Sequence, residues 1–181
     1  MNSPITYARQ GISDDDIDEV VKILRSDIIT RGKKTEEFEK SLAGYCGARY
    51  AVVFNSGTSA LHGAYFAAGL GKGDEFITSP MTFAATANAG LFLGARPVFA
   101  DVESDTGNAD FQSVYEAITD KTRLIVPVLF AGHPVESERL FSLAAERELV
   151  VVEDACHALG ASYERRHFSG GEVAGKFAGK F

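Results

Sequence analysis

The chain has 181 residues, of which 45% are hydrophobic and 24% charged, a length and balance typical of one globular domain with a sizeable core. Its formal net charge of −7 argues against a general nucleic-acid-binding protein, because such proteins need a basic face to neutralise phosphates. No stretch approaches the roughly 18 to 20 apolar residues that a membrane-spanning helix needs, so no membrane association is expected.

The first 48 residues are expected to form a helical segment. Ser13 is a good N-cap, and three aspartates follow it in the first turn, where the helix dipole favours negative charge. Apolar side chains then repeat at helical spacing. A loop over residues 26–34 separates this helix from a second one, which is predicted to begin at Thr35 and to end near Gly44 or Gly47.

After this segment, strands and helices are expected to alternate. Short apolar runs predict strands over residues 50–54, 75–78, 97–99, 124–129 and 149–152. Helices are predicted between them over residues 59–70, 83–93, 110–118 and 137–147. This alternation predicts an α/β domain with a largely parallel sheet. Ligands of such sheets bind at the carboxyl ends of the strands, so functional residues are expected just after each strand.

The end of the chain changes character at Arg165. Residues 165–181 contain Ala-Gly-Lys-Phe twice and show no helix or strand period. We therefore expect a poorly ordered, aberrant tail, separate from the domain that residues 1–164 form.

Cys46 and Cys156 are the two cysteines of the chain, and two are too few for a disulfide scaffold. Neither has a second cysteine or a spaced histidine beside it, so no metal site is expected. The first residues lack the basic start and apolar core of a signal peptide. Together these features predict a cytoplasmic protein with reduced thiols.

Residues 55–60 are the first candidate for chemistry. They follow a predicted strand and open a predicted helix, whose N-terminus offers unpaired N–H groups and the positive end of the dipole to a phosphate. Gly57 would let the backbone approach closely, and Thr58 and Ser59 would add hydroxyl donors. An ordinary strand-to-helix turn with a hydroxyl cap fits the same residues. The segment lacks the glycine patterns of nucleotide and dinucleotide loops.

Asp154 lies at the end of the predicted strand 149–152. A carboxylate there borders a low-dielectric interior, which is costly unless a positive partner is present. A protonated pyridine nitrogen would supply that partner, and the carboxylate would keep it protonated. A helix N-cap and a metal-binding acid fit the position equally well.

Phe83 and His157 also follow predicted strands. The Phe83 ring could stack on a flat cofactor, although a phenylalanine in the core is the more common role. His157 could contact a ring substituent of a cofactor or act as an acid or base, and a structural histidine fits as well.

The segments around these residues resemble, in the same order, those of the DegT/DnrJ/EryC1/StrS aminotransferases. The similarity is carried by residues 29–35, 38–39, 55–61, 82–88, 94–101 and 153–161. It implies the aspartate-aminotransferase fold, fold type I of the pyridoxal-phosphate enzymes. Residues 1–164 would then form part of its large domain, a three-layer α/β structure with a largely parallel sheet.

The resemblance implies pyridoxal 5′-phosphate as the cofactor. The residues implied to bind it are Gly57, Thr58, Ser59, Phe83, Asp154 and His157. The first three would hold the phosphate, and the phenylalanine would stack on the pyridine ring. The aspartate would pair with the ring nitrogen, which makes the ring an electron sink, and the histidine would lie near the ring oxygen.

The resemblance also implies a sugar-nucleotide site. The residues that match it are Tyr7, Asp27, Ile28, Ile29 and Thr30. Residues 30–35 and 157–160 look most like the branch that aminates C4 of a UDP-linked 4-keto-6-deoxy hexosamine in pseudaminic acid synthesis. The implied reaction transfers an amino group from an amino-acid donor to a nucleotide-linked keto sugar. It would take place in a homodimer, in which the partner subunit completes each active site.

The Schiff-base lysine of the family has no clear counterpart. Lys180 has about the right spacing from Asp154, but its setting, Ala-Gly-Lys-Phe, does not match. We therefore expect a chain truncated before the catalytic lysine, as a frameshift, a deletion or a fragmentary gene would produce. The alternative function is an inactive fragment that binds pyridoxal phosphate or a sugar nucleotide. A dehydratase with histidine in place of the lysine is disfavoured, because neither His157 nor His167 falls at the lysine position.

Overall fold

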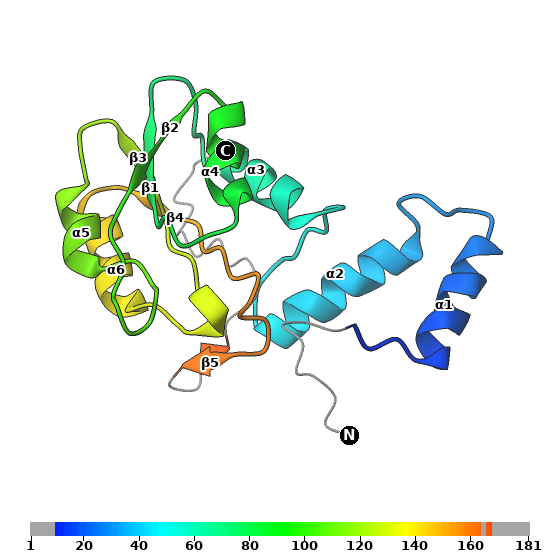
Figure 1. Ribbon diagram of the computed structural model, residues 1–181. Coiled ribbons are helices and arrows are strands. Elements are labelled where there is room, and N and C mark those ends of the chain that lie inside the picture. Colours follow the sequence, from blue (N-terminus) through cyan, green and yellow to red (C-terminus); the bar gives the residue numbers. More distant parts are fainter. Residues whose placement is uncertain (1–9, 164–165, 168–181) are drawn as a thin grey trace.

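A computed structural model describes residues 10–163 and 166–167 (Figure 1). The helices are α1 (Asp14–Leu24), α2 (Lys33–Cys46), α3 (Gly57–Ala67), α4 (Ala84–Phe92), α5 (Phe111–Glu116), the 3₁₀ turn η1 (Phe130–Gly132) and α6 (Ser137–Glu146). The strands are β1 (Glu75–Thr78), β2 (Arg96–Phe99), β3 (Thr122–Val126), β4 (Val150–Val151), β5 (Ser162–Tyr163) and β6 (Arg166–His167). Within these described residues, no helix is both long and apolar enough to cross a membrane.

Four strands form one parallel sheet in the order β2-β1-β3-β4. Each strand is followed by a connection that returns over a face of the sheet, and this brings all the carboxyl ends to one edge. At that edge Thr78, the last residue of β1, pairs with Phe99 and Val126.

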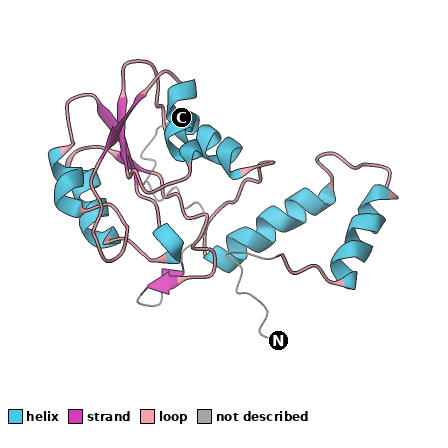
Figure 2. Cartoon of the chain, in the orientation of Figure 1, coloured by secondary structure: helices cyan, strands magenta, loops and turns pink. Residues whose placement is uncertain are grey.

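Side chains alternate between the two faces of this sheet. Phe76, Leu124 and Val126 pack with α3 and α4 on one face. Ile77 and Ile125 pack with α5 and α6 on the other. Because both faces are covered, β1 is buried along its whole length and β3 at every residue but Arg123, as expected of a parallel sheet. Figure 2 shows the resulting helix–sheet–helix arrangement, which confirms the three-layer α/β prediction.

The predicted strand over residues 50–54 is wrong. The segment has no strand structure, and Tyr50, Val52 and Phe54 are exposed. The backbone N–H of Val53 donates to the Glu39 carboxylate at 2.9 Å rather than to a strand. An apolar β-branched run favours an extended backbone, but a strand also needs a neighbouring strand for its N–H and C=O groups.

The strand predicted over 75–78 forms at those residues, and the other predicted elements form with shifted ends. The helix predicted over 59–70 is α3, two residues earlier at its start, and the strand predicted over 124–129 is β3. β5 and β6 pair as a short antiparallel hairpin, so Arg166 and His167 have strand structure inside the segment predicted as a disordered tail. The rest of that tail lies outside the described residues.

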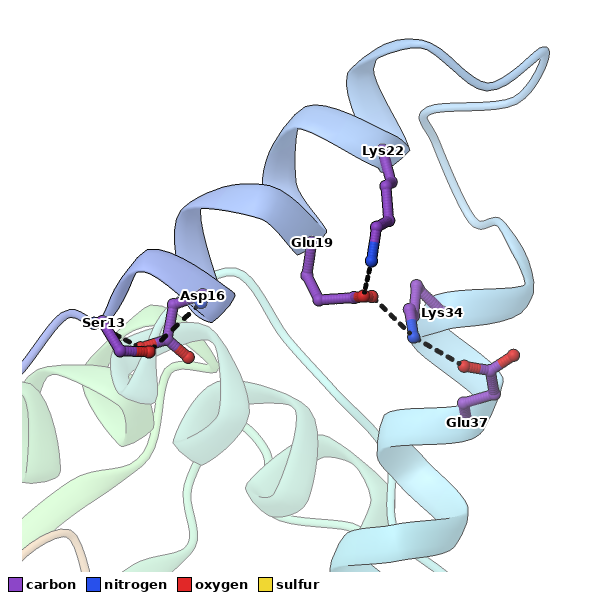
Figure 3. A network of polar contacts seen from close by, with 6 residues as sticks. All are labelled: Ser13, Asp16, Glu19, Lys22, Lys34 and Glu37. Carbon is purple, nitrogen blue, oxygen red and sulfur yellow. Dashed lines mark hydrogen bonds and ion pairs between the residues drawn. The ribbon is translucent and has the colours of Figure 1, made fainter.

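The N-terminal helices extend away from the sheet (Figure 1). Ser13 and Asp16 form a reciprocal capping box at the start of α1, as the N-cap prediction required (Figure 3). Lys34 joins the two helices through ion pairs of 3.1 Å to Glu19 and to Glu37 (Figure 3). These pairs are exposed and contribute little to stability. No residue of α1 is buried, so its apolar face is open in this chain.

Glu75 begins β1 with a buried carboxylate. Arg96 at the start of β2 forms an ion pair with it, and the Thr119 hydroxyl donates to its second oxygen at 2.8 Å. The hydrogen bonds from Arg96 and Thr119 hold the pKa of Glu75 below its ordinary value. This cluster ties β1, β2 and the start of β3 together at the amino edge of the sheet.

Glu75→Gln is expected to lower the free energy of unfolding by about 1 kcal/mol at pH 7, since it removes the charge from a partly screened pair. The folded pKa lies below the unfolded one, so the contribution of Glu75 is complete above the unfolded value of about 4.3 and is lost as the pH falls through the folded value. Urea unfolding at pH 7 and below pH 4 measures this, with Glu116→Gln as the exposed control. A difference between wild type and variant that does not shrink in acid contradicts the assignment.

Candidate functional site

The candidate site lies at the carboxyl edge of the parallel sheet. β1 leads from Thr78 into the start of α4, and β4 leads from Val151 to Asp154. The backbone N–H of Asp154 donates to the carbonyl of Pro127 at 2.9 Å, and its carbonyl accepts from Leu129 at 3.1 Å. These bonds continue the β3–β4 pairing past the last strand residues and fix the backbone that carries the carboxylate.

The N-terminus of α3 forms one side of this edge. Ser56 is the N-cap and accepts from the backbone N–H of Ser59 at 3.2 Å, and the two hydroxyls lie 3.0 Å apart. The first turn contains no acidic residue, so the positive end of the dipole is not neutralised. A Cβ at Gly57 would lie 3.6 Å from the Cys156 sulfur, which places this turn beside the segment that follows Asp154.

Asp154 is held by the first turn of α4. Asp154 is buried, with 7% of the residue exposed, and the Thr86 hydroxyl donates to its Oδ2 at 2.7 Å. The backbone N–H of Cys156 donates weakly to Oδ1 at 3.4 Å. Thr82 and Thr86 have hydroxyls 2.7 Å apart. No helix begins at Asp154, which removes the N-cap alternative.

Two further titratable groups, the Tyr65 hydroxyl and the Cys156 thiol, lie close to Asp154. Tyr65 is fully buried and donates to the carbonyl of Thr86 at 3.0 Å, and burial, with a smaller effect of the Asp154 charge, raises its pKa well above the ordinary value. Cys156 is an exposed residue, but burial of its thiol and a hydrogen bond to Asp154 raise the pKa to about 12. Both groups therefore stay protonated at neutral pH, and the thiol is a poor nucleophile.

Phe83 immediately precedes α4 and is 78% exposed. Phe83 is therefore not part of the core that the described residues form, and its ring face is open to a planar ligand. The amide of Thr86 donates to the Phe83 carbonyl at 3.1 Å, so the ring and the Asp154 network share one helical turn. His157 is exposed three residues after Asp154, in a turn.

The residues present fit pyridoxal phosphate. A helix N-terminus without acidic residues at Gly57, an exposed ring at Phe83 and a buried carboxylate at Asp154 lie at one sheet edge, joined by the contacts of Cys156 and Thr86. The helix N-terminus suits a phosphate, the Phe83 ring suits an aromatic face, and the Asp154 carboxylate suits a protonated ring nitrogen. Among the described residues, no group of three or more His, Cys, Asp or Glu side chains could hold a metal ion.

The predicted substrate residues are not brought to this site. Asp27, Ile28, Ile29 and Thr30 lie in the loop between α1 and α2, at the end of α2 that is farther from the sheet (Figure 1). Tyr7 and Lys180 lie outside the described residues.

Sequence reasoning missed the residues that surround Asp154. Thr86, Thr82 and Tyr65 come from other elements, and Thr86 is 68 positions away from the carboxylate in the chain. One signal could have found two of them, since two threonines four residues apart at a helix start share a face. That Thr86 contacts Asp154 depends on how α4 packs over the sheet.

Comparisons with known proteins agree with this geometry. The sequence model of the DegT/DnrJ/EryC1/StrS aminotransferase family matches residues 10–178. The chain is 41% identical over 165 residues to the spore coat polysaccharide biosynthesis protein SpsC of Bacillus subtilis, covering 91% of this chain and 42% of that protein. It is 42% identical over 163 residues to the UDP-4-amino-4,6-dideoxy-N-acetyl-beta-L-altrosamine transaminase of Campylobacter jejuni, covering 88% of this chain and 43% of the transaminase.

The chain is also similar in fold to solved structures of aminotransferases. S. venezuelae DesV superposes with a TM-score of 0.82 at 37% identity, covering 84% of this chain and 41% of that one. Helicobacter pylori PseC, an aminotransferase involved in the biosynthesis of pseudoaminic acid, gives 0.83 at 34%, with 90% and 44% covered. Bacillus subtilis NtdA with bound PMP gives 0.76 at 34%, with 82% and 35% covered. The chain therefore spans about two fifths of the length of the curated relatives it matches.

Proposed function

The chain belongs to the DegT/DnrJ/EryC1/StrS aminotransferase family, and we propose that it forms the cofactor-binding part of a pyridoxal-phosphate enzyme that aminates a nucleotide-linked keto sugar. The observation that carries the proposal is the placement of Phe83 and Asp154. One helical turn presents an exposed ring and, through Thr86, holds a buried carboxylate. A flat cationic heterocycle is the ligand class that uses both.

Each proposed cofactor residue has a separate task. Gly57 and Thr58 belong to the open N-terminus of α3, where the dipole and the N–H groups attract a phosphate, and the Ser59 hydroxyl joins them. Asp154 keeps a pyridine nitrogen protonated by charge pairing in a largely dry site. Bound pyridoxal phosphate supplies the electron-withdrawing ring that stabilises charge at the amino carbon. His157, exposed at the same edge, is proposed to lie beside the ring oxygen.

The substrate assignment rests on relatives. The Campylobacter jejuni transaminase bears the name of a UDP-linked amino sugar, and it is 42% identical to this chain over 163 residues. We propose a nucleotide-linked keto sugar as amino acceptor and an amino acid as donor. Because the loop 27–30 stands away from the sheet edge, we propose that Tyr7 and residues 27–30 contact the sugar nucleotide at the site of a partner subunit in a homodimer. A cytoplasmic location fits soluble substrates of this kind.

The second candidate is a fragment that binds pyridoxal phosphate without turnover. It is favoured by one observation, the Ala-Gly-Lys-Phe setting of Lys180, which does not match that of the Schiff-base lysine of the family. Both candidates require the same cofactor contacts. They differ in whether an amine of the chain bonds to the cofactor.

Incubation with pyridoxal phosphate separates the two candidates. We expect saturable binding by the intact chain under both candidates. The second candidate predicts no covalent fixation at Lys180 after borohydride reduction, because that lysine lacks the expected setting. Equilibrium dialysis measures the binding, and peptide mass spectrometry locates any reduced adduct, with Lys180→Arg as the matched control. Fixation at Lys180 in the wild type, absent in Lys180→Arg, would assign the Schiff-base role to that lysine and contradict the second candidate. Absence of any binding would contradict the proposed function.

A further inference from the structure

A line of hydroxyl groups leads from the surface of α4 to the Asp154 carboxylate. Thr86 is fully buried, and its hydroxyl lies 2.7 Å from Oδ2 of Asp154. The hydroxyl of the half-buried Thr82, four residues earlier and just before α4, lies 2.7 Å from that of Thr86. The backbone under Thr86 is anchored in turn, because Tyr65 donates to its carbonyl at 3.0 Å.

The direction of these bonds follows from the number of protons. An ionised carboxylate can only accept, so the Thr86 hydroxyl gives its single proton to Asp154. Thr86 then has lone pairs but no proton for its neighbour, and Thr82 must be the donor in the bond between them. Thr82 therefore donates to Thr86, and Thr86 donates to Asp154.

The two carboxylate oxygens are held unequally. Oδ2 receives the short bond from Thr86, whereas Oδ1 receives the weak 3.4 Å bond from the Cys156 amide. A short bond to one oxygen fixes the plane of the carboxylate and leaves the other oxygen with capacity for a further donor. Thr86 approaches from the same turn that presents the Phe83 ring.

We propose that Thr86 is a positioning residue that orients the Asp154 carboxylate toward the ring nitrogen of the cofactor, with Thr82 fixing the direction of its hydroxyl. The inference rests on the proposed function. Thr86 itself has no proposed contact with the cofactor, and it acts through the angle at which Asp154 meets the ring. The same helix turn then sets both the stacking plane and the position of the charge in that plane.

The test compares Thr86→Val, which keeps the shape and removes the hydroxyl, with Thr86→Ser, which keeps the hydroxyl. Thr78→Val is the matched control, since the buried Thr78 hydroxyl donates to the Val126 carbonyl at 2.9 Å. With pyridoxal phosphate labelled by ¹⁵N in the ring, we expect the NMR signal of the protonated nitrogen in the wild type, Thr86→Ser and Thr78→Val. In Thr86→Val we expect that signal to weaken and the Kd to rise about threefold to tenfold.

Crystal structures of the cofactor-free variants provide the second measurement. We expect the Asp154 side chain to leave its wild-type rotamer in Thr86→Val and to keep it in Thr78→Val. An unmoved Asp154, or equal ring protonation in the two valine variants, would overturn the role of Thr86. If the wild type fails to bind pyridoxal phosphate while Asp154 moves in Thr86→Val alone, the positioning role stands and the proposed function fails.

Discussion

Gly90→Ala is expected to lower the free energy of unfolding by about 1–3 kcal/mol, the range for overpacking a core. Gly90 is a buried residue of α4, and a Cβ there would lie 2.2 Å from a ring carbon of Phe76. Phe76 is fully buried in β1 and packs against Tyr65 with ring centroids 5.6 Å apart, so its ring cannot turn away. The clash therefore forces α4 off the sheet. Urea unfolding followed by circular dichroism measures the loss.

Gly63→Ala is the matched control for this effect. Gly63 is also a helical glycine, in α3, and a Cβ there would lie 2.6 Å from the Phe54 ring. Phe54 is exposed on a segment without strand structure, so its ring can move. The gain of about 0.5–1 kcal/mol from replacing glycine in a helix should then equal or exceed the cost of the contact. Equal destabilisation by the two substitutions would contradict the account of a rigid Phe76.

The parallel sheet was predictable because its strands carry their own signal. β1 was predicted at the same residues, Glu75–Thr78, because Phe76 and Ile77 at its centre are apolar and suit a strand whose two faces are both buried. Residues 50–54 carry the same signal and form no strand. The difference lies in neighbours, because β1 is flanked by β2 and β3, whereas no described strand pairs with 50–54.

The sequence predicted which residues lie at the candidate site, but not which hydrogen bonds join them. The expectation that Asp154 borders a dry interior agrees with its 7% exposure, because a carboxylate after a buried strand cannot move far from it. Its hydrogen-bond partner could not be predicted, since the choice of Thr86 depends on how α4 packs over the sheet. The exposure of Phe83 likewise depends on what the chain leaves uncovered.

Asp154→Asn is expected to raise the Kd for pyridoxal phosphate about 10- to 100-fold. The amide has the shape of the carboxylate and can still accept the hydrogen bond from Thr86, so the fold around it should persist. It carries no charge to pair with a protonated ring nitrogen, and loss of a hydrogen bond between charged groups costs about 1.5–3 kcal/mol. Absorbance titration with pyridoxal phosphate measures the Kd, and thermal unfolding checks that stability is retained.

Asp101→Asn tests whether binding of pyridoxal phosphate depends on where the negative charge lies or only on its presence at this edge of the sheet. Asp101 lies two residues after the end of β2, at the same carboxyl edge of the sheet, but it is exposed and accepts from the N–H of its own neighbour Val102 at 2.8 Å. Its loss changes the net charge by the same amount as the loss of Asp154. If general attraction of a cationic ring controlled binding, the two variants would weaken it equally. If a buried, oriented carboxylate controls binding, Asp154→Asn alone raises the Kd, and this is the result that the short bond from Thr86 leads us to expect.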